Sequence, residues 1–191
     1  MSFPLVVSFY TDDPYYSNEV LGLKRTCQQF DMEYDIECLP SSGSWTANCA
    51  MKGPFLKRKM LQHNRPLLWL DADALVLQKP EMFDGFLYEF AAYWHKNVEL
   101  ISATLYFAPT VVCKTLLSMW AKLCEDDPGT WDQKSLQKAW ERMGVAQPAT
   151  LRLHKGFCKT YNHSCDFPLY IQQNQASRRF KKLVNSGGKT K

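Results

Sequence analysis

The sequence predicts an α/β fold in which helices cover both faces of a mostly parallel central sheet. Three observations indicate it. Strand-like and helix-like apolar patterns alternate over residues 5–71, which is typical of a layered α/β fold. The run 65–71 (RPLLWLD) is apolar on both faces, as a central parallel strand is. With 191 residues, of which 46% are hydrophobic, the chain is long enough for one domain with a sizeable core.

Local signals place the elements of the first half. Asp13 suits a helix N-cap, and Pro14 suits the first helical turn, where its missing N–H costs nothing. The alternation of polar and apolar residues at 34–39 predicts a strand. In order, we expect a strand at 5–10, a helix from Asp13-Pro14, a strand at 34–39, a helix over 46–62 that is broken or bent at Gly53-Pro54, and a strand at 65–71.

The pattern changes after residue 71. Strands and helices still follow one another, but with more short strands and loops toward the end. The sequence predicts strands at 74–78, 87–94 and 100–108, helices at 110–124 and 132–143, and short strands and loops to about 171.

Charge separates the end of the chain from its body. The net charge is +4, but six of the 23 basic residues lie in the last fourteen, which leaves 17 basic against 19 acidic residues elsewhere. This balance excludes a basic nucleic-acid-binding body. The basic end is either solvated or contacts an anion through Arg178 and Arg179. Residues 185–191 (NSGGKTK) predict a flexible tail or linker, so the chain is a candidate module of a larger multidomain protein.

Cysteine usage predicts a reducing compartment. Seven cysteines, with no CxxC pair and no signal-peptide pattern, indicate reduced thiols and a cytoplasmic protein. The cluster of Cys158, His163 and Cys165, with His154 nearby, matches no spacing typical of zinc sites. The longest apolar run, near 100–113, is too short for a membrane span.

The segment Leu70-Asp71-Ala72-Asp73 carries the sharpest chemical signal. In extended backbone, Asp71 and Asp73 point the same way at the carboxyl end of a central strand, where ligands of open α/β sheets bind. Two converging carboxylates repel each other, and Mg²⁺ or Mn²⁺ would relieve that repulsion. The competing interpretation is a pair of carboxylates that cap helices or remain solvated.

Six segments, one of which contains Asp71 and Asp73, are informative when they are taken together. They are SFYTDDPYY at 8–16, SWTAN at 44–48, WLDADALVLQKPEMF at 69–83, ISATLYF at 101–107, WDQKSL at 131–136 and QNQASRR at 173–179. Together they cover most of the chain. In these segments the sequence resembles the small, metal-dependent nucleotide-sugar glycosyltransferases of the GT-A fold, of the bacterial and viral type.

The resemblance implies a three-layer sandwich formed by one domain over residues 1–184. The nucleotide-binding half would be about 1–80, and the half that binds the sugar and the acceptor about 81–184. The implied reaction moves a sugar from a nucleoside-diphosphate sugar to a hydroxyl of a glycan or glycoconjugate acceptor. Family frequency favours a UDP-sugar as donor, and the implied cofactor is Mn²⁺ or Mg²⁺.

The resemblance also implies roles for single residues. Asp73 would ligate the metal, and Asp71 would contact the ribose or reach the metal, directly or through water. Lys52 would lie near the phosphates, unless it is a surface lysine of its helix. The nucleoside would lie against Tyr10, Thr11 and Asp12, although Tyr10 also suits ordinary strand packing. The remaining positions expected in the donor site are Trp45, Ser102, Gln173 and Arg178.

Two assignments stay open. Many relatives place a histidine as a further metal ligand near the C-terminus, but the matching stretch 170–174 (YIQQN) has none, which leaves Gln173 or His154 as possible helpers. Asp132 is the candidate base that deprotonates the acceptor hydroxyl, and it also suits a helix N-cap. The aromatic residues that could form a platform for a sugar face, unless they belong to the core, are Trp131, Trp94 and Tyr93.

Two other functions compete with glycosyl transfer. A phosphohydrolase that uses two aspartates as nucleophile and acid fits LDADAL, but such a domain normally carries them on its first strand. A non-catalytic carbohydrate- or nucleotide-binding module on the same scaffold fits as well, because no catalytic base is secure.

Overall fold

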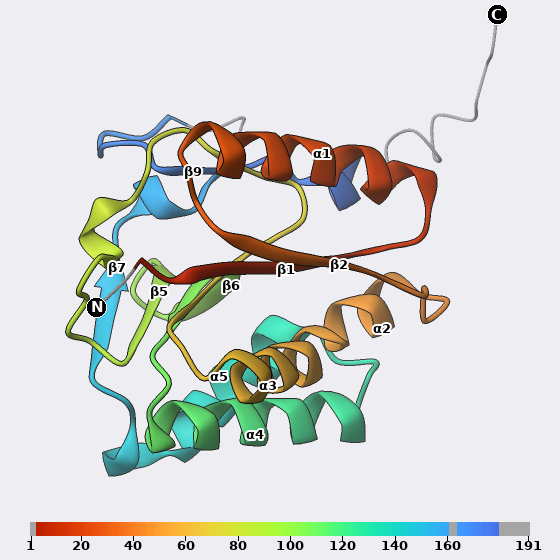
Figure 1. The fold of residues 1–191 in the computed structure, drawn as a ribbon. Helices are drawn as coiled ribbons and strands as arrows, with labels where there is room; N and C mark the ends of the chain where they lie inside the picture. The colour runs from red at the N-terminus through yellow and green to blue at the C-terminus, as the bar shows by residue number, and fades with distance from the viewer. Residues whose placement is uncertain (1–2, 161–163, 180–191) are drawn as a thin grey trace, which may run out of the picture.

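The computed structural model describes residues 3–160 and 164–179 (Figure 1). The first half contains β1 (Leu5–Thr11), α1 (Pro14–Gln29), β2 (Tyr34–Leu39), α2 (Trp45–Ala50), α3 (Lys52–His63), β3 (Leu67–Leu70) and β4 (Ala74–Val76). The second half contains η1 (Glu81–Phe83), β5 (Phe90–His95), β6 (Glu99–Phe107), α4 (Val111–Asp126), α5 (Asp132–Arg142), η2 (Gly144–Ala146), β7 (Thr150–Leu153), η3 (Lys155–Phe157), β8 (Lys159–Thr160) and β9 (Ile171–Gln173).

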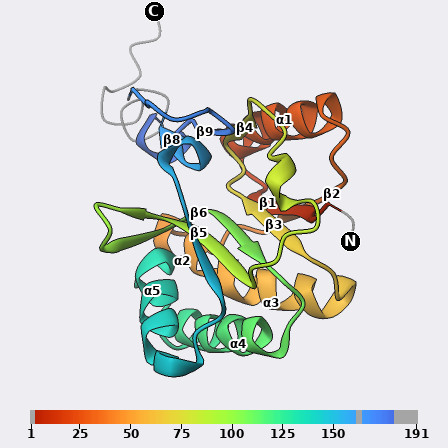
Figure 2. The ribbon, with the colours of Figure 1, turned by 90° about the vertical axis from the view of Figure 1, so that its left-hand side faces the viewer.

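The main sheet has six strands in the order β2-β1-β3-β6-β5-β7. The pairs β1–β2, β1–β3 and β5–β7 are parallel, and β6 runs antiparallel to both of its neighbours. Helices α3, α4 and α5 cover one face, whereas α1 and the small sheet β4-β9-β8 cover the other (Figures 1 and 2). The predicted α/β class with a mostly parallel sheet is therefore confirmed.

The alternation along β1 explains the two cores. Leu5, Val7 and Phe9 point into the apolar cluster on the α3–α5 side, whereas Val6 belongs to the cluster under α1 and the small sheet. Trp69 of β3 joins the first cluster and Leu70 the second. A strand that is apolar on both faces must lie between two covered layers, so the prediction of a central strand at 65–71 is confirmed by β3.

Most predicted boundaries are confirmed, and one is wrong. Asp13 caps α1 by accepting from the Tyr16 N–H at 2.9 Å, with Pro14 in the first turn. The helix is broken as expected, but the break lies at Met51 and not at Gly53-Pro54, which are in the first turn of α3. Proline is tolerated there because its N–H would have no intrahelical partner.

Gly53 has a packing role. A Cβ atom at this position would lie 3.1 Å from the backbone of Ala121 in α4. The glycine therefore lets α3 and α4 approach closely, which holds the start of α3 against the rest of its layer.

Other expectations fall partly outside the described residues. These are His163 of the Cys/His cluster, the tail at 185–191 and most of the basic end. The described cysteines form no disulfide. Among the described helices, none combines the length and the apolarity that a membrane crossing requires.

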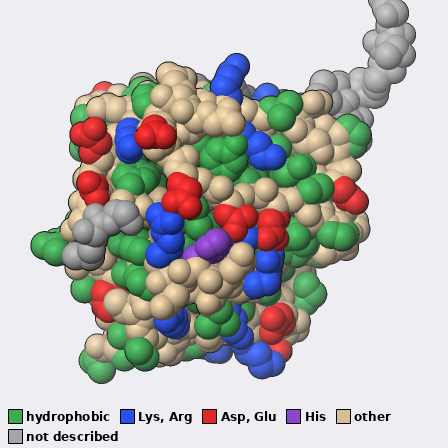
Figure 3. Space-filling view, in the orientation of Figure 1, with side chains coloured by type: hydrophobic (Ala, Val, Ile, Leu, Met, Phe, Trp, Pro, Cys, Tyr) green, Lys and Arg blue, Asp and Glu red, His purple; other side chains and the backbone are tan. Residues whose placement is uncertain are grey.

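A charged network joins the edge strand β2 to α3. Lys59 is almost fully buried and pairs with both Asp35 and Glu37, while Arg58 donates to Glu37 at 2.5 and 3.1 Å and His63 contacts Asp35 at 2.8 Å. Acidic and basic side chains lie next to one another on this face of the molecule (Figure 3). Charged side chains along an edge strand also discourage its pairing with another chain.

This network makes a testable contribution to stability. Arg58, opposed by burial and assisted by Lys59, lowers the pKa of Glu37 from 4.5 to about 2. Because the unfolded chain takes up this proton first as the pH falls, the stabilisation is complete above about pH 4.5 and is lost toward pH 2. We expect Glu37→Gln to lower the free energy of unfolding by about 1 kcal/mol at pH 7, and the difference to vanish near pH 2.

Urea unfolding of both proteins across this pH range measures the effect. Glu33→Gln is the matched control, because Glu33 forms a solvent-exposed pair with Arg65 and is 66% exposed. A Glu37→Gln difference that is independent of pH would contradict the prediction.

Candidate active site

A cleft of about 860 Å³ opens beside the carboxyl ends of β1 and β3. This size and position are usual for a ligand site in an open α/β sheet. Among the residues predicted for the site, those that line the cleft are Tyr10, Thr11, Trp45, Lys52, Asp71, Asp73, Ser102, Asp132, Gln173 and Arg178. Asp12 is not among the lining residues; it is exposed and accepts a hydrogen bond from the Ser41 N–H.

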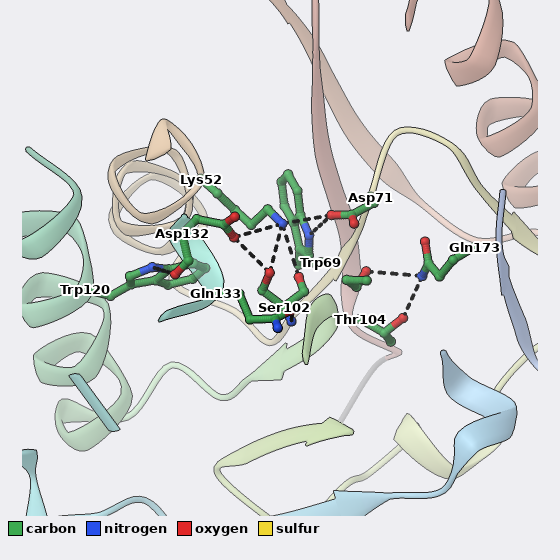
Figure 4. Close-up of polar contacts among 10 residues, drawn as sticks. Lys52, Trp69, Asp71, Ser102, Thr104, Trp120, Asp132, Gln133 and Gln173 are labelled. Atoms are coloured by element: carbon green, nitrogen blue, oxygen red, sulfur yellow. Dashed lines mark hydrogen bonds and ion pairs between the residues drawn. The ribbon is translucent and has the colours of Figure 1, made fainter. Parts of the chain in front are cut away.

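A buried ammonium group holds one wall of the cleft together (Figure 4). The Nζ atom of Lys52 lies 2.9 Å from Asp71 Oδ1, 3.1 Å from Asp132 Oδ2, and 3.3 Å from both oxygens of Ser102. The Trp69 Nε1–H donates to the same Asp71 oxygen at 3.0 Å. Lys52 is only 6% exposed, so the interpretation of this residue as a surface lysine is wrong.

Burial and charge shift the protonation equilibria of this wall in opposite directions. Burial alone lowers the pKa of Lys52, but the carboxylates of Asp132 and Asp71 raise it more, so its pKa lies above the usual value. Burial raises the pKa of Asp71 and outweighs the opposite effect of Lys52. The acceptors around Lys52 outnumber its three N–H bonds, which favours a role in orienting Asp71 over direct contact with phosphate.

Asp73 enters the cleft from a turn. The strand β3 ends at Leu70, and the Ala74 N–H donates to the Asp71 carbonyl at 2.9 Å, so the expected extended backbone through both aspartates is wrong. Both side chains nevertheless line the same cleft. Asp73 Oδ2 accepts from the Ala176 N–H at 2.6 Å, and burial, together with the charge of Asp71, raises its pKa to about 6.

Asp132 is fixed more firmly than a simple base would be. Its side chain is 1% exposed, and its Oδ2 accepts from Ser102 Oγ at 2.8 Å in addition to the Lys52 contact. Its Oδ1 is buried and has no hydrogen-bond partner among the described residues. The N-cap of α5 is Trp131, without a capping side-chain bond, so the interpretation of Asp132 as the N-cap is wrong.

The aromatic predictions divide between cleft and core. Trp131 and Tyr93 line the cleft, and Trp131 packs against Trp45 with 6.1 Å between ring centroids. Trp94 is 5% exposed and packs against Trp140 in the core. Trp94 therefore contributes no platform for a sugar.

Residues of the C-terminal segment line part of the cleft. Gln173 of β9 and the exposed Arg178 both line it, whereas Arg179 turns away and pairs with Glu19 at 2.6 Å. Of the two expected anion contacts, only Arg178 faces the cleft. His154 accepts from the Gly156 N–H and stacks on Phe167, and it is not among the residues that line the cleft.

Sequence reasoning missed three notable cleft residues, Tyr16, Gln133 and Cys158. Gln133 directly follows Asp132; its Oε1 accepts from the Ser102 N–H and its Nε2 donates to Glu99. Tyr16 lies in the first turn of α1, just after the N-cap Asp13, and this position near the end of β1 could have suggested that it lines the cleft. Cys158 stands out in the sequence only through its neighbouring cysteine and histidines, and nothing there indicates that it lines the cleft.

The donor set at the cleft suits a hard divalent cation. Asp71 and Asp73 supply carboxylate oxygens, and the pKa of each is raised because burial disfavours the charged form. Mg²⁺ and Mn²⁺ prefer carboxylate oxygens as ligands. Within residues 3–160 and 164–179, no group of three or more His, Cys, Asp or Glu side chains could hold a metal. A cation here would therefore need ligands of another kind as well.

Comparison with known proteins finds similarity in the fold but not in the sequence. No protein-family model and no curated protein matches the sequence. A glycosyltransferase involved in the glycosylation of the major capsid of PBCV-1 superposes with a TM-score of 0.70 and 10% identity, over 96% of this chain and 99% of that one.

The galactosyltransferase LgtC, solved with donor and acceptor sugar analogues, superposes with a TM-score of 0.55 and 12% identity over 95% of each chain. An active-site mutant of LgtC gives 0.54 and 10%, again over 95% of each chain. At these identities the likeness establishes the fold alone. The chain has the α/β fold of the GT-A glycosyltransferases.

Proposed function

We propose that the chain is a glycosyltransferase that uses a nucleoside-diphosphate sugar and a divalent cation. One observation carries the proposal: Asp71 and Asp73 share a cleft at the carboxyl end of β3, in a chain with the GT-A fold. The neighbours whose descriptions name glycosylation and galactosyl transfer support it. A UDP-sugar is the proposed donor, and a glycan or glycoconjugate hydroxyl is the proposed acceptor.

In the reaction, the bond between the sugar and the diphosphate breaks, and the acceptor oxygen forms the new bond as its proton leaves. A bound Mn²⁺ or Mg²⁺ would stabilise the negative charge on the departing diphosphate. Asp73 and Asp71 would hold that ion, and Lys52 fixes Asp71 through the 2.9 Å contact. Arg178, at the rim of the cleft, adds positive charge on the side of the C-terminal segment.

The donor would be held along β1. Tyr10 lies at the end of this strand and lines the cleft beside Thr11. An aromatic ring at such a position can stack on a base. Trp45 and Trp131, paired across the cleft wall, offer an apolar surface for a sugar face.

The test measures nucleoside-diphosphate release from a panel of nucleotide sugars, with Mn²⁺ and after chelation. The proposal expects release from at least one donor, and only with the cation. A phosphohydrolase would ignore the nucleotide sugars and release phosphate from a generic phosphoester. A binding module would bind a nucleotide sugar without turnover in any of these mixtures.

The role of Tyr10 gives a separate prediction. Tyr10→Ala should weaken UDP binding about 10-fold, because base–aromatic stacking contributes about 1–3 kcal/mol. Binding of inorganic diphosphate should not change, since it has no base. Calorimetric titration of both ligands in the presence of Mn²⁺ measures this, with Tyr88→Ala as control, because Tyr88 is 42% exposed and does not line the cleft. Equal weakening for both ligands would contradict stacking on Tyr10.

A further inference from the structure

Gln173 carries a buried oxygen atom whose purpose the proposed function does not explain. The residue is 5% exposed, and its Oε1 atom has no hydrogen-bond partner among the described residues. Its Nε2 atom donates to the Ala103 carbonyl at 3.3 Å and to Thr104 Oγ1 at 3.1 Å. A buried acceptor without a partner has lost its hydration and gained no hydrogen bond in return, so a ligand that pairs with this oxygen would recover that loss.

The surrounding hydrogen bonds fix which end of the amide faces outward. The Ala103 carbonyl can only accept a hydrogen bond. The Thr104 hydroxyl donates its hydrogen to the Phe157 carbonyl at 2.7 Å, so toward Gln173 it also acts as an acceptor. Rotating the amide by 180° would therefore place its oxygen against two acceptors. The carbonyl oxygen must therefore point away from Thr104, as Figure 4 shows.

This oxygen belongs to the same wall as the two aspartates. The Ala103 carbonyl that accepts from Gln173 also accepts from the Asp71 N–H at 3.1 Å. Gln173 pairs with Ala74 in the small sheet, and the next residue, Asn174, donates its N–H to the Asp73 carbonyl at 3.3 Å. Gln173, Asp71 and Asp73 all line the cleft.

We infer that Gln173 Oε1 is a third protein ligand of the divalent cation, an inference that rests on the proposed function. An acceptor without protons cannot pair with a diphosphate oxygen, but it can pair with a cation. The protein ligands are then two carboxylates and an amide carbonyl, all oxygen. Such a set suits Mg²⁺ and Mn²⁺ and gives no preference to Zn²⁺ or Co²⁺, which bind imidazole well.

Mn²⁺ titration in the presence of UDP tests the inference without measuring turnover. Free Mn²⁺ is followed by its electron paramagnetic resonance signal. Gln173→Ala should weaken Mn²⁺ binding about 10-fold, whereas Gln173→His, which supplies a nitrogen ligand, should raise the ratio of Zn²⁺ to Mn²⁺ affinity about 10-fold. The second variant retains an N–H donor and keeps the test decisive if Gln173→Ala does not fold.

Gln172→Ala is the matched control on the same strand. Gln172 bonds to Asn174 and Lys159 and does not line the cleft, so this variant should bind Mn²⁺ as the unaltered protein does. If both Gln173 variants keep the Mn²⁺ affinity and the metal ratio while Asp73→Asn loses Mn²⁺, the inference is overturned and the proposed function stands. If the unaltered protein with UDP binds no Mn²⁺ and releases no nucleoside diphosphate from any donor, the proposed function fails, and the inference fails with it.

Discussion

Replacement of Asp73 by asparagine is expected to lower nucleoside-diphosphate release about 10³-fold, which corresponds to about 4 kcal/mol of transition-state stabilisation. The substitution removes the negative charge that would hold the cation over the departing diphosphate. It retains an oxygen that accepts from the Ala176 N–H, the 2.6 Å contact that ties the C-terminal segment to the turn after β3. The variant should therefore fold normally and lose only the chemistry.

The measurement is the release rate at saturating donor and Mn²⁺, with thermal unfolding as the check on the fold. Asp84→Asn is the control, because Asp84 is an exposed carboxylate outside the cleft and should leave the rate unchanged. Release that persists within a factor of ten in a folded Asp73→Asn protein would remove the reason for assigning the metal to this pair.

The central layer was predictable because its signals are local. The apolar run at 5–10 predicts the buried strand β1, and the two apolar faces of the run at 65–71 place β3 at the centre. Asp13 and Pro14 fix the start of α1 through contacts within one turn. The position of Asp71 and Asp73 at the mouth of a cleft follows from the strand that precedes them, even though the backbone there turns.

The environment of the site could not be predicted because it depends on contacts between distant segments. Lys52 and Lys59 look like surface residues of a helix, and both are buried because carboxylates from other elements surround them. The orientation of the Gln173 amide depends on Thr104 and on Phe157, which lie in two other elements. No spacing within the sequence contains that information.

Replacement of Lys52 by methionine is expected to destabilise the fold by about 3–5 kcal/mol, the usual cost of removing one partner from a buried ion pair. Lys52 and Asp132 expose 8% and 1% of their side chains. Without the ammonium, Asp132 would be a buried carboxylate held by the Ser102 hydroxyl alone, and it would also face Asp71. Urea unfolding measures the loss. Lys57→Met on the same helix, a partly exposed position, should change stability by at most about 0.5 kcal/mol.

The same measurement decides what Asp132 does. If its carboxylate mainly neutralises Lys52, the double variant Lys52→Met/Asp132→Asn should be more stable than the sum of the two single losses predicts, by about 1–3 kcal/mol. Asp132→Asn alone should then lower stability, because the ammonium retains only Asp71 as a charged partner. A general base would behave differently: Asp132→Asn would reduce kcat strongly in a protein as stable as the original. The buried contacts of Asp132 with Lys52 and Ser102 favour the first result, and a collapse of kcat in an Asp132→Asn protein of unchanged stability would establish the second.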